Sequence, residues 1–166
     1  MRTLRPLALA DFESQPVRIS GSARLDADPL SVFAELSDPS LWFPLMTRSV
    51  WKTGATSGVG AEREIRHRVL GTARERMLAW DTGARVAFTM TQVSSPFIDQ
   101  IGEDWLLARE GIYTRVDWKI VATPSRLGWA AMPVMRRLLT SLFARACTNI
   151  QKRAGTLKRE HAKNVS

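Results

Sequence analysis

The sequence predicts an α+β domain in which a curved, seven-stranded antiparallel sheet wraps around a long C-terminal helix. Segments that alternate apolar and polar residues follow one another closely after residue 46, separated by short breaks rich in turn residues. Two aspartate–proline pairs, Asp28-Pro29 and Asp38-Pro39, interrupt the pattern earlier and are typical of helix starts. After Pro124 the apolar residues recur every three or four positions, which indicates an amphipathic helix.

Length and composition indicate one globular domain. A chain of 166 residues with 45% hydrophobic content can bury a core without disulfides. It has no apolar run of about 20 residues, so we expect no membrane-spanning segment. The single cysteine, Cys147, excludes an internal disulfide and favours a reducing, cytoplasmic location. With two histidines and no ligand spacing, we expect neither a metal nor a cofactor.

The first part of the chain is expected to hold one strand and two short helices. Residues 1–15 look like a loosely held N-terminal extension, and the domain proper is expected to cover residues 16–160. After Pro16, apolar residues alternate from Val17 to Leu25, as in a strand. The two aspartate–proline pairs then open two short helices in tandem, between the first and second strands.

The remaining strands and the long helix follow in order. Short turn segments between the strands indicate hairpins, and therefore antiparallel pairing. Pro133 either starts the main helix, expected over 133–157, or kinks it. Residues 161–166 form a basic tail. The strands are expected at 47–54, 59–70, 73–81, 85–93, 98–109 and 112–123.

Positive charge is concentrated in the C-terminal segment. The net charge is +8, and the residues from Arg126 onward hold nine Lys/Arg against one acid, Glu160. One interpretation is a solvated helix face. The other is a weak contact with an anionic membrane surface. Nucleic acid is not an expected partner, because no zinc-finger, helix-turn-helix or RNA-binding signature is present.

Several segments resemble one known superfamily in order. These are SGSARLDADPLSVFAELSDPSLWFPLM (20–46), GVGAERE (58–64), ARERMLAWD (73–81) and YTRVDWKIVATP (113–124). They resemble the polyketide cyclase/dehydrase and lipid-transport branch of the START-like, or SRPBCC, superfamily. The resemblance implies a helix-grip fold and a cavity under the long helix that takes lipids, sterols, polyketides or hormones. Some members are cyclases and others only carriers, so the resemblance alone does not assign an activity.

Alternation along the strands predicts which side chains face the helix. On 98–109 the two faces are both apolar, and we prefer Trp105 and Leu107 inward over Leu106 and Ala108. The predicted interior is apolar apart from Arg63, His67 and Glu75. The residues expected to line a ligand cavity are Arg63, Ile65, His67, Glu75, Met77, Phe88, Met90, Trp105, Leu107, Val116, Trp118, Met135, Leu139 and Leu142.

The three ionisable residues allow two interpretations. Strands 59–70 and 73–81 are hairpin neighbours, so Arg63 or His67 can meet Glu75 and form a structural ion pair. Alternatively, these groups orient a ligand inside an apolar pocket. The resemblance adds that polar residues on these two strands often line the pocket of ligand-binding members.

Three functions remain open at this stage, and neither the ligand nor the oligomeric state follows from the sequence. The favoured one is binding or carrying of a hydrophobic small molecule. The second is a polyketide cyclase/dehydrase-type enzyme, with His67 as the candidate general base. The third is a docking module that acts through the basic helix. If Phe88, Trp105 and Trp118 fill the cavity completely, only the docking function remains.

Overall fold

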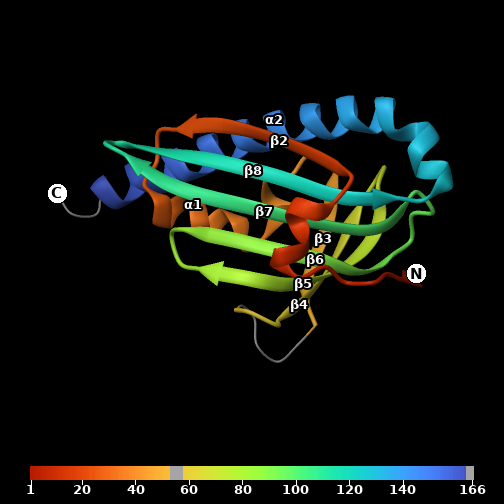
Figure 1. Ribbon diagram of the computed structural model, residues 1–166. Coiled ribbons are helices and arrows are strands. Elements are labelled where there is room, and N and C mark those ends of the chain that lie inside the picture. The colour runs from red at the N-terminus through yellow and green to blue at the C-terminus, as the bar shows by residue number, and fades with distance from the viewer. Residues whose placement is uncertain (53–57, 164–166) are drawn as a thin grey trace.

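The computed structural model describes residues 1–52 and 58–163, with side chains to residue 154. Its eight-stranded antiparallel sheet has the order β2-β8-β7-β6-β5-β4-β3, and β1 pairs separately with β6. This confirms the predicted α+β class and the curved antiparallel sheet with a long C-terminal helix (Figure 1). The strands are β1 (Arg2–Thr3), β2 (Val17–Leu25), β3 (Met46–Trp51), β4 (Glu62–His67), β5 (Gly71–Asp81), β6 (Arg85–Val93), β7 (Ile98–Glu110) and β8 (Tyr113–Pro124).

β4 is shorter than the segment 59–70 predicted for it. Gly58 and Gly60 have φ of 101° and 85°, a left-handed backbone that ends the strand early on one side. At the other end the His67 ring accepts hydrogen bonds from the amides of Val69 and Leu70, which closes a turn. The alternation of apolar and polar residues predicts neither the left-handed glycines nor the turn that His67 closes. The last two residues of the predicted strand 47–54 lie outside the described residues.

Two short helical segments follow β2, as predicted. Asp28 caps α1 (Pro29–Leu36), because its Oδ1 accepts hydrogen bonds from the amides of Leu30 and Ser31 at 3.0 and 3.1 Å. Asp38 caps the second segment in the same way, but that segment is a single 3-10 turn, η2 (Pro39–Leu41). Trp42 then anchors the chain, since its indole N–H donates to the Glu35 carbonyl at 2.5 Å.

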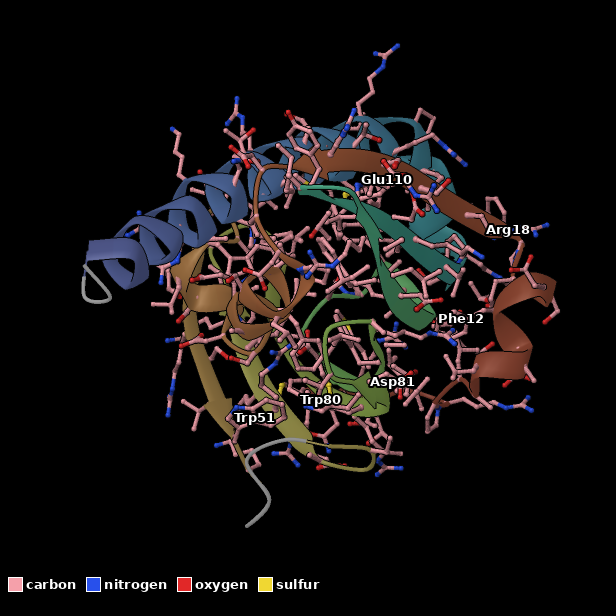
Figure 2. The ribbon with its side chains drawn as sticks, turned by 90° about the vertical axis from the view of Figure 1, so that its left-hand side faces the viewer. Phe12, Arg18, Trp51, Trp80, Asp81 and Glu110 are labelled. Atoms are coloured by element: carbon pink, nitrogen blue, oxygen red, sulfur yellow. The ribbon has the colours of Figure 1, made fainter. Side chains whose placement is uncertain are left out.

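The C-terminal helix α2 (Arg126–Lys163) crosses the open side of the curved sheet (Figure 2). Pro133 lies inside this helix, and its first turns run at an angle to the rest (Figure 1). The second half is firmly packed: its buried residues are Leu142, Phe143, Ala146, Cys147, Ile150 and Ala154. No residue from 129 to 141 is buried to that degree. The helix is therefore anchored by its second half, while its first half roofs the space beneath.

The expectation that residues 1–15 are loosely held is wrong. Leu4, Leu7 and Phe12 are buried, and the 3-10 helix η1 (Leu9–Ser14) lies on the face of the sheet opposite α2 (Figures 1 and 2). Phe12 packs so closely that a Cβ added at Gly102 would lie 2.6 Å from its ring. The physical reason is that Val121 and Leu78 make this outer face apolar, so it needs a cover.

No helix in residues 1–52 or 58–163 is long and apolar enough to cross a membrane.

Replacing Phe12 by alanine tests the packing of the N-terminal segment. We expect Phe12→Ala to lower the free energy of unfolding by about 3–5 kcal/mol, the usual loss for a buried phenylalanine. Chemical denaturation measures it. Ile112→Ala is the control, since Ile112 is 67% exposed and we expect a change within about 0.5 kcal/mol. An equally small effect of both substitutions would show that the segment contributes nothing to folding.

Candidate functional site

A cavity of about 120 Å³ lies between the concave face of the sheet and the first half of α2. Its roof consists of Gly128, Met132, Met135 and Leu139. Its remaining walls come from strands β3 to β8 with their connecting segments and from the segment between the end of α1 and Phe43. The walls are mainly apolar. Nine of the predicted residues line it: Arg63, Ile65, His67, Glu75, Phe88, Met90, Trp105, Met135 and Leu139.

The other five predicted residues lie elsewhere in the core. Met77, Leu107, Val116, Trp118 and Leu142 are buried but do not line the cavity. The cavity ends at Trp105, which pairs with Trp118, and Leu107 pairs with Val116 one step further along these strands. Alternation predicted the inward face correctly, including that of Trp105 and Leu107, but it carries no information on position along the strand.

Aromatic packing closes the cavity at that end. The Phe143 ring of α2 stacks on Trp105 at 5.2 Å between centroids and contacts Trp118 at 4.5 Å. Trp42 meets Trp105 edge-on at 5.5 Å. The large side chains therefore fill one half of the space under α2 and leave the other half open.

Arg63 and Glu75 form a buried ion pair on neighbouring strands. Arg63 Nε and Nη2 lie 2.8 and 2.7 Å from Glu75 Oε2, and both side chains are at most 3% exposed. Arg63 Nη1 also donates to the carbonyls of Leu36 and Ser37, at the C-terminal end of α1, where helix carbonyls lack partners. Burial raises the pKa of Glu75 above its ordinary 4.5, and the Arg63 guanidinium opposes this rise. The pair thus joins the sheet to α1.

His67 has no free ring nitrogen. Its Nδ1 accepts from the amides of Val69 and Leu70 at 3.1 and 3.0 Å, so Nε2 carries the proton and donates to the Pro44 carbonyl at 2.9 Å. Burial lowers the pKa of His67 below 6.5, and the bond to Pro44 opposes this shift. The ring lines the cavity but offers no lone pair to a ligand, which argues against the predicted role as a general base.

Glu103 is the residue that the sequence reasoning missed. It lies on β7, paired with Phe88 of β6 and Ile120 of β8, and it lines the cavity. Burial and the nearby charge of Glu75 raise its pKa to about 8, while its hydrogen bond with Trp105 and the Arg63 charge oppose the shift. It is therefore largely protonated at neutral pH. The sequence did contain a signal for it. Glu103 lies two residues before Trp105 on the same strand, so the two side chains are expected to face the same way.

Metal binding and thiol chemistry find no support in the described part of the chain. No three His, Cys, Asp or Glu side chains there are grouped so as to hold a metal ion. Cys147 is buried, and burial raises the pKa of its thiol to about 11, which keeps it protonated and unreactive.

The order of the elements and the cavity under α2 define a helix-grip protein of the START-like kind. A sequence model of the family described as polyketide cyclase / dehydrase and lipid transport matches residues 16–155. The chain belongs to this family, as the resemblance predicted.

Known proteins resemble this chain in sequence, and solved structures resemble it in fold. An uncharacterised protein of Mycobacterium tuberculosis (strain ATCC 25618 / H37Rv) is 25% identical over 154 residues, covering 88% of this chain and 89% of that protein. A START superfamily protein from Mycobacterium smegmatis superposes with a TM-score of 0.69 at 11% identity, over 84% of this chain and 98% of that one. The di-domain ARO/CYC BexL from the BE-7585A biosynthetic pathway gives 0.70 at 14% identity, over 87% and 53%. At these identities the solved structures show the fold alone.

The raised pKa of Glu103 predicts a specific pH dependence of stability. Between pH 4.5 and about 8 the folded protein keeps a proton on Glu103 that the unfolded chain loses. Its free energy of unfolding should therefore fall as pH rises through this window, relative to Glu103→Gln, which does not titrate there. We expect a difference of up to about 1.4 kcal/mol per pH unit, measured by urea denaturation at pH 5, 6, 7 and 8.

His67 does not disturb this comparison. Its lowered pKa makes the free energy of unfolding rise with pH below pH 6.5, and this contribution is present in both the wild type and Glu103→Gln. Parallel stability curves for the two proteins would show that Glu103 titrates normally.

Proposed function

We propose that the protein binds and carries a small apolar molecule in the cavity beneath the first half of α2. The observation that carries this proposal is the cavity itself, with apolar walls and a roof that is not firmly packed. Small-molecule sites are usually concave and apolar, with a few polar groups that orient the ligand. Here the polar side chains are Arg63, His67, Glu75, Ser95 and Glu103, of which all but Ser95 are ionisable.

The volume indicates the size of ligand that fits without rearrangement. An apolar cavity of about 150 Å³ in another protein accommodates benzene, so 120 Å³ suits roughly one ring or a short alkyl chain. A larger ligand requires the roof to move. Met132 and Met135 have flexible thioether side chains that repack readily, and the helix is already interrupted at Pro133.

The polar side chains of the cavity favour a carrier over an enzyme, because most of them are already engaged by groups of the protein. A cyclase or dehydrase needs a general base near an enolisable carbon. His67 was the candidate, but both of its nitrogens are engaged by the backbone. Glu75 is engaged by Arg63. Glu103 is therefore the group on which an enzyme of this kind would have to rely.

Filling the cavity tests the proposal. Leu139→Trp puts a larger side chain into the roof, whereas Thr140→Trp, one residue further, points it into solvent. We expect the wild type and Thr140→Trp to bind ethylbenzene, a one-ring probe, with similar affinity, and Leu139→Trp to bind it at least tenfold more weakly, as followed by NMR titration. If the wild type does not bind this probe, or if both variants lose binding equally, the carrier proposal fails.

A second candidate function is contact with an anionic membrane surface. The outer side of the roof exposes Leu127, Trp129 and Val134, at 62%, 50% and 71%. Arg136 and Arg137 lie on the same exposed turns. Aromatic and aliphatic side chains flanked by arginine are typical of helices that lie in the interface of a bilayer. A membrane contact here would place lipid directly above the cavity roof.

Vesicle sedimentation tests this contact. We expect the wild type to bind phosphatidylglycerol vesicles at low salt, and the double variant Trp129→Ser/Val134→Ser to bind several-fold more weakly. Ile112→Ser, at an equally exposed position in the β7–β8 turn, serves as the control. The absence of wild-type binding at low salt would exclude a membrane contact through this surface.

A further inference from the structure

Four ionisable side chains line the cavity, and three of them are engaged within the protein. Arg63 and Glu75 bind each other, and Arg63 uses its remaining nitrogen on two carbonyls. His67 is held by the backbone through both ring nitrogens. Glu103 is the fourth, and its contacts are different.

Glu103 retains hydrogen-bonding capacity toward the cavity. Its Oε2 accepts one long hydrogen bond, 3.4 Å, from Trp105 Nε1. Among residues 1–52 and 58–154, no group hydrogen-bonds to Oε1. The Glu75 side chain is held by Arg63 and is only 3% exposed, whereas Glu103 is only half-buried. Glu103 therefore presents a carboxyl oxygen to the space that a ligand would occupy.

The surroundings of Glu103 favour the neutral carboxylic acid. Glu75 on β5 faces it with a negative charge, and the balancing Arg63 guanidinium on β4 is already committed to Glu75. His67 on β4 lines the same cavity in its neutral form. The described cavity residues of β6, β8 and α2 carry no charge. A neutral carboxyl group has an O–H, which is a hydrogen-bond donor.

We propose that Glu103 anchors an uncharged, mostly apolar ligand by donating its carboxyl O–H to a carbonyl oxygen of that ligand. This inference rests on the proposed binding function and assigns the polar contact within the same cavity. A hydrogen-bond donor without a partner is unfavourable inside an apolar cavity, and a ligand carbonyl supplies an acceptor. The protein should therefore prefer a ketone to a hydrocarbon of the same shape.

Two probes of nearly equal size separate the hydrogen bond to Glu103 from the apolar contacts within the cavity. Acetophenone and ethylbenzene both match the small cavity, but only acetophenone carries a carbonyl. We expect the wild type at pH 6.5 to bind acetophenone about three- to tenfold more tightly, the range for one neutral hydrogen bond. At pH 9.5 the carboxylate has no proton to donate, so the preference should disappear. Binding is measured by titration in ¹H–¹⁵N NMR spectra.

Two variants complete the test. Glu103→Gln keeps an N–H donor but does not titrate, so its preference for acetophenone should persist at both pH values. Glu103→Leu has no donor and should bind the two probes equally, and its retained ethylbenzene binding shows that the cavity is intact.

The possible failures are distinguishable. If neither probe binds the wild type, the proposed function fails and the inference fails with it. If both probes bind equally at pH 6.5, only the role of Glu103 is overturned. Tighter binding of benzylammonium than of acetophenone at pH 6.5 would also overturn it, because Glu103 would then act as a carboxylate toward cations.

Discussion

The Arg63–Glu75 ion pair is the interaction on which the rest of the site depends. It joins β4 to β5 and, through Arg63, to the end of α1. Removing one partner of a buried pair leaves an uncompensated charge, which usually costs about 3–5 kcal/mol. The sheet, the first helix and the wall of the cavity are therefore coupled through one guanidinium, and that group is not available to a ligand.

Burial, and after it the same ion pair, determine the protonation of Glu103. Because Arg63 is committed to Glu75, a second carboxylate in this region would lie near a negative charge without a cation of its own. Glu103 is therefore more stable when protonated, and the proton adds a hydrogen-bond donor to a side chain that otherwise only accepts. Two carboxyl groups on the same interior face thus acquire different roles, one structural and one available to the cavity.

Sequence patterns predicted the fold well and the site only in part. Alternation identified the inward face of Arg63, Glu75 and Trp105, and helical spacing identified α2, because both signals are local. Position along a strand is not local: Met77 and Trp118 are buried as predicted, yet neither lines the cavity, and Trp118 packs against Phe143 instead. The bonds that occupy His67 come from a turn that alternation cannot reveal.

The two halves of α2 separate stability from ligand access. Phe143 stacks on the tryptophans and buries its whole side chain, which holds the second half in place. The methionine roof packs less firmly, so it can adapt to ligands of different length without loss of the core. Glu103 lies on β7, which is paired with β6 and β8 on its two sides, and it lines the same cavity as this roof. Recognition in such a site depends on where the ligand places one oxygen atom, and much less on how long its apolar part is.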